Sequence, residues 1–180
     1  MDARHILPLV ILQAIVLTSC QRQNAPPRSD GGPTFQYVKE KQGGCGDVFF
    51  YKGTADDLEV LWISADKKKL KLPDKGTVSF DLATAPDGLE VAIDLWEQAP
   101  RFRAYCNDIS PDAEKKSTWM AKKGKLILTM FEPPAPTGPG FRTYKASVRL
   151  EGVVFEDDAG HKATLDVETI SEVLVGWYAG

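Results

Sequence analysis

The sequence predicts an all-β domain, an antiparallel β-sandwich of immunoglobulin-like or related topology with about eight strands. Three observations indicate this class. Apolar and polar residues alternate in short segments from Cys45 onward, turn signals rich in Gly, Pro and Asp separate these segments, and helical signals are few. Period-two alternation is typical of strands that bury one face. A closed barrel is the alternative that the pattern leaves open.

The expected strands follow one another along the chain. Segments with this alternation, or with a short apolar run, are 47–51, 58–63, 77–82, 89–96, 102–106, 125–131 and 144–154. An acidic turn at 156–161 is expected to lead into a return strand over 165–175, with a kink near Ser171. The stretch 110–116 has a capping serine followed by proline, so one or two helical turns are expected there.

The pattern of the N-terminal residues indicates an export signal. Residues 6–17 form an apolar run that is too short for a membrane span, which needs roughly 20 residues. The run ends in Leu17, Thr18, Ser19 and Cys20, a junction that resembles the lipobox of bacterial lipoproteins. The resemblance covers these first residues only. It implies that a signal peptide, 1–19, is removed and that Cys20 is lipidated on its sulfur and its new amino group. An ordinary secreted protein is the alternative.

The segment after Cys20 is expected to be a tether. Residues 21–34 are rich in Pro, Gly and polar side chains and lack an apolar period, so 20–36 is interpreted as lipidated cysteine plus flexible tether. The β-sandwich domain is expected over 37–180. The lipoprotein resemblance implies a bacterial cell envelope location, anchored to a membrane by the lipid on Cys20 and facing the periplasm or exterior. Inner and outer membrane stay open, although Gln21 is not the aspartate that retains some Gram-negative lipoproteins at the inner membrane.

The charge composition excludes one class of binding partner. The net charge of −3 provides no basic stripe, so nucleic acid is not expected as a partner. The lysines at 67–69 and 71 are interpreted as a solvated turn, with a polyanion patch as the weaker reading.

Two cysteines remain once Cys20 is assigned to lipid. Cys45 and Cys106 are expected to form a disulfide, because paired cysteines are the rule in exported chains. In the chain-entropy description, closing a loop of about 60 residues would contribute about 4 kcal/mol to the stability of the folded domain. Free buried thiols and a reactive thiol are the alternatives, but the chain shows neither a C-x-x-C pair nor a histidine near either cysteine.

Signals for catalysis are weak. The chain beyond the signal has one histidine, His161, and it falls in the expected turn, so no catalytic residue, cofactor or zinc site is expected. The acidic cluster 156–158 suits a turn, with a calcium site left open. Carboxylate pairs such as Asp56 with Asp57, or Asp108 with Asp112, are the candidates for an alternative function, a cell-wall or glycan-acting hydrolase.

The expected function is therefore non-enzymatic binding of an envelope protein or a glycan. Trp96 falls on the polar face of its segment and is the candidate for stacking against a sugar. The second candidate is a stiff loop that would project between two strands and that carries Pro133, Pro134, Pro136 and Pro139.

Overall fold

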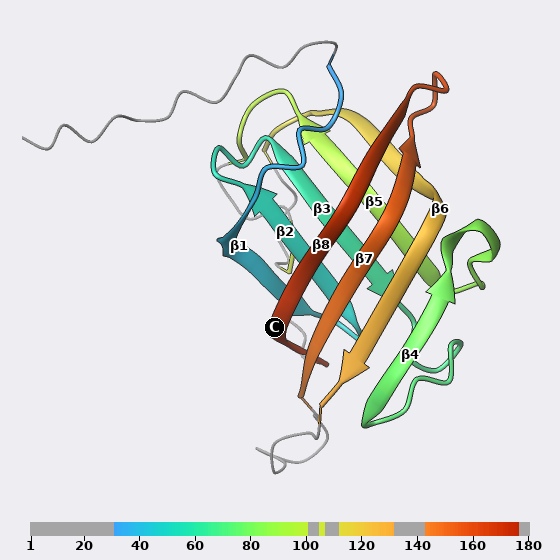
Figure 1. Ribbon diagram of the computed structural model, residues 1–180. Helices are drawn as coiled ribbons and strands as arrows, with labels where there is room; N and C mark the ends of the chain where they lie inside the picture. The colour runs from blue at the N-terminus through green and yellow to red at the C-terminus, as the bar shows by residue number, and fades with distance from the viewer. Residues whose placement is uncertain (1–30, 101–104, 107–111, 132–142, 177–180) are drawn as a thin grey trace, which may run out of the picture.

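The computed structural model describes residues 31–100, 105–106, 112–131 and 143–176 (Figure 1). Its strands are β1 (Tyr37–Cys45), β2 (Phe49–Thr54), β3 (Glu59–Ala65), β4 (Gly76–Asp81), β5 (Leu89–Trp96), β6 (Lys115–Met130), β7 (Tyr144–Glu156) and β8 (Lys162–Val175), with a short 3-10 helix η1 (Leu82–Thr84) after β4. All strand pairs are antiparallel, which confirms the all-β prediction. Within the described ranges, no helix is long and apolar enough to cross a membrane.

One continuous sheet contains all eight strands. Its order is β1-β2-β3-β5-β6-β7-β8, and β4 pairs with β6 outside this path. The long strand β6 allows this, because its first part pairs with β5 and its last part with β4. Between the two parts the register with β7 shifts twice, around Lys123, as expected of bulges that bend a strand. Gly124 lies at this bend with φ +119°, and a Cβ there would come within 2.7 Å of the Val153 backbone.

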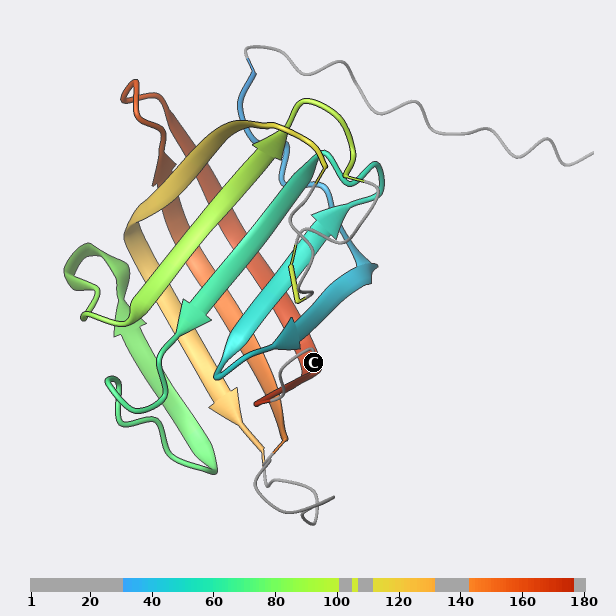
Figure 2. The same ribbon diagram turned by 180° about the vertical axis from the view of Figure 1, so that it is seen from behind.

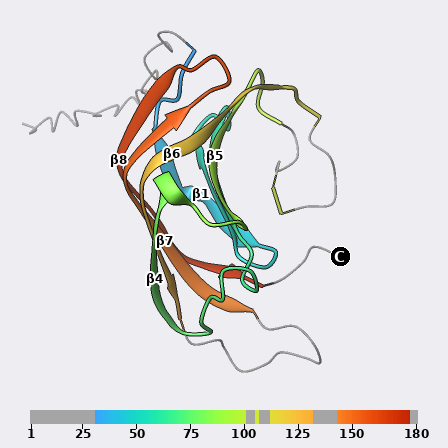
Figure 3. The ribbon, with the colours of Figure 1, turned by 90° about the vertical axis from the view of Figure 1, so that its right-hand side faces the viewer.

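The bent sheet folds into two walls that face each other. Strands β1, β2, β3 and β5 form one wall, and β4, β6, β7 and β8 form the other (Figures 2 and 3). The expected immunoglobulin-like sandwich is not confirmed, since hydrogen bonding passes without a break from one wall to the other through β6. The first and last strands of the order, β1 and β8, come side by side, so the sheet is nearly closed and resembles the barrel alternative more than two stacked sheets.

Side chains bridge β1 and β2 to β8 where the sheet nearly closes. Gln42 Nε2 donates a hydrogen bond of 3.0 Å to the Ser171 carbonyl. Lys52 Nζ donates to Glu168 Oε1 at 2.8 Å and to the Thr169 carbonyl at 3.0 Å. We call this line of contacts the seam. The Lys52–Glu168 ion pair is largely shielded from water, with side-chain exposures of 10% and 16%.

Alternate residues of the strands fill the space between the walls. The fully buried large side chains include Phe50, Leu61, Ile93, Leu126 and Phe155. Each contributes roughly 1.5–3 kcal/mol by leaving water. The expected alternation over 89–96 reflects this core, because Leu89, Val91 and Ile93 are buried there. In 144–154 the alternation holds as far as Leu150, and the buried face then changes at Gly152, so that Val153 enters the core instead of Val154.

Most of the expected strands are present, and the differences have physical causes. Strand β6 starts at Lys115, well before the expected 125–131, because its polar first part pairs with β5. Lys115 and Lys116, expected in a helical turn, therefore lie in a strand. Tyr105 and Cys106, expected to end a strand, lie in a bend, and 102–104 are outside the described residues. The kink near Ser171 is confirmed, since the β7–β8 register shifts there and Glu172 has φ 54°.

Candidate functional site

The disulfide between Cys45 and Cys106 anchors the connection from β5 to β6. The two Cα atoms are 5.6 Å apart, which is ordinary for a disulfide. The bridge confirms the predicted pairing. It joins the end of β1 to the β5–β6 connection, which is not part of a strand, and so it fixes the position of the neighbouring Tyr105.

Four aromatic rings gather on the outer face of the first wall. Because Phe50 points into the core, its neighbours Phe49 and Tyr51 point outward. Trp62 pairs with Tyr51 across the β2–β3 ladder, and Tyr105 reaches the same face from the β5–β6 connection. Centroids of Phe49–Trp62, Phe49–Tyr105 and Tyr51–Tyr105 are 6.1, 5.7 and 6.2 Å apart, with ring planes within 25° of parallel. We call these four half-buried rings the aromatic platform.

Gly43 lies under one end of the platform. It is paired with Tyr51 across the β1–β2 ladder, and a Cβ at this position would lie 2.6 Å from Cζ of the tyrosine ring. The ring therefore lies across the glycine backbone. A side chain at 43 would push it away from the sheet.

A buried carboxylate holds Tyr105 at its other end. The Tyr105 hydroxyl donates a hydrogen bond to Asp94 Oδ2. Asp94 is 1% exposed and also accepts from Thr118 Oγ1 at 2.6 Å, while Lys115 Nζ lies 3.2 Å from Oδ2. Burial raises the pKa of the Tyr105 phenol above its usual range, and the negative charge of Asp94 raises it further. The phenol therefore keeps its proton and acts as a donor.

An open hollow of about 700 Å³ adjoins the platform at the end of β3. Phe49 and Tyr105 of the platform form its aromatic side, next to the disulfide. Its charged lining consists of Asp47, Asp66, Glu90 and Lys69. A concave site that combines aromatic rings with a few polar groups is the usual form of a ligand site.

Backbone hydrogen bonds orient two of these carboxylates. Asp47 Oδ2 accepts from the Lys67 amide at 2.6 Å, and Asp66 Oδ1 accepts from the Lys69 amide at 2.8 Å. The Lys69 ammonium lies 3.0 Å from Asp87, and this hydrogen bond is the main reason that the lysine pKa is raised. The hollow therefore presents fixed acceptor oxygens beside an aromatic surface.

The N-terminal segment is attached at the opposite end of β3. Thr34 donates to Glu59 Oε2 through its amide at 2.6 Å and its hydroxyl at 2.9 Å, and the Phe35 amide donates to Oε1 at 3.0 Å. Glu59 is fully buried, and the Phe35 ring lies 6.2 Å from that of Phe155. We call this attachment the clasp. Strand β3 separates the clasp from the hollow by about 20 Å, at roughly 3.3 Å per residue.

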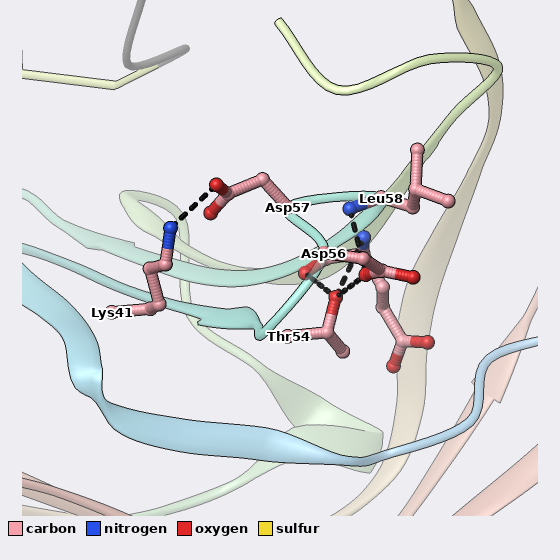
Figure 4. A network of polar contacts seen from close by, with 6 residues as sticks. Lys41, Thr54, Asp56, Asp57 and Leu58 are labelled. Carbon is pink, nitrogen blue, oxygen red and sulfur yellow. Dashed lines mark hydrogen bonds and ion pairs between the residues drawn. The ribbon is translucent and has the colours of Figure 1, made fainter. Parts of the chain in front are cut away.

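The carboxylate pair at Asp56 and Asp57 has a structural role in the nearby turn (Figure 4). Asp56 Oδ1 accepts from Thr54 Oγ1 at 2.6 Å and from the Leu58 amide at 3.1 Å. Asp57 Oδ2 lies 2.6 Å from Lys41 Nζ. The Asp56 carboxylate thus stabilises the turn between β2 and β3, and the Asp57 carboxylate links this turn to Lys41 of β1.

The second acidic turn is organised in the same way. Asp157 Oδ1 accepts from the Ala159 amide at 3.0 Å and the His161 amide at 2.8 Å, and its Oδ2 lies 2.8 Å from His161 Nδ1. The hydrogen bond to His161 is the main cause that lowers the Asp157 pKa. Among the residues that the structure describes, no three His, Cys, Asp or Glu side chains are grouped to hold a metal.

Trp96, the expected stacking residue, is not open to a partner. It lies on the outer face of β5, as its neighbours indicated, but it is only 3% exposed, with Lys115 Nζ 5.9 Å from the ring centroid. Asp112 is exposed and lines an open depression of about 420 Å³ with other acidic residues. Several expected site residues lie outside the described residues, namely Asp108, Pro133, Pro134, Pro136 and Pro139.

The platform was missed from the sequence, although part of its signal is present. Three consecutive aromatic residues at 49–51 cannot all face the core of a period-two strand, so Phe49 and Tyr51 had to point outward once Phe50 pointed inward. Trp62 joins them only through the β2–β3 register, and Tyr105 only through the disulfide and Asp94. No local pattern indicates these two contacts.

Comparison with known proteins adds no assignment. No family model, no curated protein and no solved structure matches the chain.

Proposed function

We propose that this chain is a lipid-anchored protein of the bacterial cell envelope and that its domain binds a glycan on the aromatic platform and in the hollow beside it. The observation that carries the proposal is the cluster of near-parallel half-buried rings next to a hollow with fixed carboxylate oxygens. The apolar faces of sugars stack on such rings, and their hydroxyls donate to such oxygens.

The chemistry of the surface favours a glycan over a protein partner. Large, contiguous and exposed apolar patches mark protein-binding surfaces. The large hydrophobic residues that are exposed in the described ranges are Phe131, Val167 and Leu174, and none belongs to the platform. The platform rings are half-buried and bordered by Asp47 and Glu90, which suits a polyhydroxyl ligand.

The glycan we propose is an extended β-1,4-linked amino-sugar chain, as found in bacterial cell walls. Such a chain is flat, and the apolar faces of its sugars can lie against a patch of near-parallel rings such as the platform. The lipid on Cys20 would hold the domain in the cell envelope, where such a glycan is found. The clasp at Glu59 supports the orientation, because the chain enters the domain there, about 20 Å from the hollow at the other end of β3. The hollow would then face away from the membrane.

The test measures binding by the full lipidated protein in detergent micelles. The probes are purified peptidoglycan sacculi in a pull-down assay and a β-1,4-linked N-acetylglucosamine hexamer in calorimetric titration. Phe49→Ala and Trp62→Ala are each expected to weaken hexamer binding by roughly tenfold, equivalent to about 1.4 kcal/mol. Leu174→Ala is the matched control, because it removes an exposed apolar side chain from the other wall.

The control should bind like the wild type. Removal of a half-buried ring should lower the thermal transition of Phe49→Ala and Trp62→Ala, so binding is compared at a temperature where every variant is folded. Wild-type protein that binds neither probe would contradict the proposal. Release of glycan fragments that stops when Asp112 is replaced would instead support the hydrolase alternative.

A further inference from the structure

We propose that Asp94 is a positioning residue of the aromatic platform, which holds the Tyr105 ring against Phe49 and Tyr51 in the orientation that binds the glycan. This inference rests on the proposed function, since it assigns a role within the same site. Tyr105 needs such a partner because, unlike the other three platform residues, it does not lie in a strand. It lies between the end of β5 and the start of β6.

The position of the Asp94 carboxylate is fixed by the sheet. Its neighbours Ile93 and Leu95 are fully buried in the core, so Asp94 points to the outer face, where it is 1% exposed. Thr118 pairs with Asp94 across the β5–β6 ladder and donates to its Oδ1 at 2.6 Å. A buried carboxylate is stable only when donors surround it. Thr118 and Lys115 already supply two, and both come from β6.

The Tyr105 hydroxyl binds the second oxygen of this fixed carboxylate. The disulfide of Cys106 holds the backbone beside Tyr105, and the hydrogen bond holds the far end of the ring. Attachment at both ends fixes the ring plane, which lies 25° from that of Phe49 and 19° from that of Tyr51. Without the hydrogen bond the ring still contributes apolar surface to the platform, but it is free to change its orientation. Ligand binding must then fix that orientation, which costs affinity.

Tyr105→Phe isolates this effect, because it removes the hydroxyl and keeps the ring. We expect it to weaken binding of the N-acetylglucosamine hexamer by roughly threefold to tenfold, the cost of ordering a side chain on binding. Asp94→Ala should weaken binding to a similar degree. Asp94→Asn keeps an acceptor for the phenol and should restore part of the affinity.

A double-mutant cycle on the full lipidated protein separates positioning from general stability. If Asp94 acts through Tyr105, Asp94→Ala should have little further effect on hexamer affinity in the Tyr105→Phe background. Thr118→Val is the control, because it removes a different hydrogen bond of Asp94 and leaves the phenol in place. It should lower the thermal transition without changing hexamer affinity.

Three results would overturn the inference. Tyr105→Phe could bind the hexamer as tightly as the wild type, a result that holds even where Asp94→Ala does not fold. Asp94→Ala could weaken binding equally in both backgrounds. In both cases the wild type binds and the proposed function stands. A wild type that does not bind the hexamer removes the proposed function and this inference with it.

Discussion

Gly43 has no room for a side chain, because the Tyr51 ring lies over it. Gly43→Ala is expected to displace that ring and to lower the free energy of unfolding by about 1–3 kcal/mol, as overpacking does. Urea unfolding measures the change. Gly53→Ala is the matched control, since the nearest atom to a Cβ there is 3.5 Å away, an ordinary contact. Equal losses in both variants would show that the ring plays no part.

The raised pKa of Tyr105 predicts a loss of stability in alkali. The folded protein keeps the phenol proton at a pH where the unfolded chain, with a tyrosine pKa of about 10, has lost it. Unfolding then releases a proton, so this contribution is fully present below about pH 10 and is lost as the pH rises above it. Urea unfolding between about pH 9 and 11 should therefore show a steeper decline for the wild type than for Tyr105→Phe. Parallel declines would contradict the assignment.

At the scale of strands, the seam depends on the ion pair between Lys52 and Glu168. Lys52→Met removes the ion-pair partner of a shielded carboxylate, which keeps only the hydrogen bond from the Thr169 amide, and is expected to cost about 1–3 kcal/mol. The control is Lys41→Met, because the Lys41–Asp57 pair is 41% exposed on both sides and should contribute at most about 1 kcal/mol. Thermal unfolding of both variants gives the comparison. Similar losses would mean that the seam does not depend on this pair.

Strands that bury one face were predictable, and those set by their partners were not. Alternation in 89–96 and 144–154 indicated strands directly, because every second residue enters the core in 89–95 and in 144–150. The change of the buried face at Gly152 could not be read from the alternation. Strand β1 contains two adjacent glycines and several charges and carries no apolar period, so only its ladder with β2 makes it a strand. The first part of β6, rich in lysine, depends on β5 in the same way. The single curled sheet follows from the bend at Gly124, which no alternation reveals.

The residues of the candidate site show the same difference between features that the sequence predicts and features that depend on tertiary contacts. The disulfide could be predicted because cysteine pairing depends on number and compartment. Trp96 was assigned to the outer face correctly, but its burial beside Asp94 depends on the tertiary arrangement. The platform combines residues from two strands and a connection, so its existence required the register and the bridge.

For the whole molecule, the lipid anchor is the prediction with the simplest test. Cys20→Ala should abolish fatty-acid labelling and leave either uncut precursor or a misprocessed soluble form. Metabolic labelling with a radioactive fatty acid, followed by immunoprecipitation, measures this. Cys45→Ala is the control and should remain labelled, because Cys45 is committed to the disulfide. Labelling that persists in Cys20→Ala would contradict the lipoprotein interpretation.

The clasp at Glu59 also determines how tension would cross the proposed assembly. A lipid in the membrane pulls on the chain where it enters β1 at Tyr37, and a bound cell-wall glycan pulls at the hollow, beside Cys45 at the other end of that strand. Because these two points lie at opposite ends of β1, the load would run along the backbone of that strand, and its hydrogen bonds to β2 would carry little of it. The domain would thus serve as a mechanical link between the wall and the membrane, and the predicted flexible tether before it would let their spacing vary.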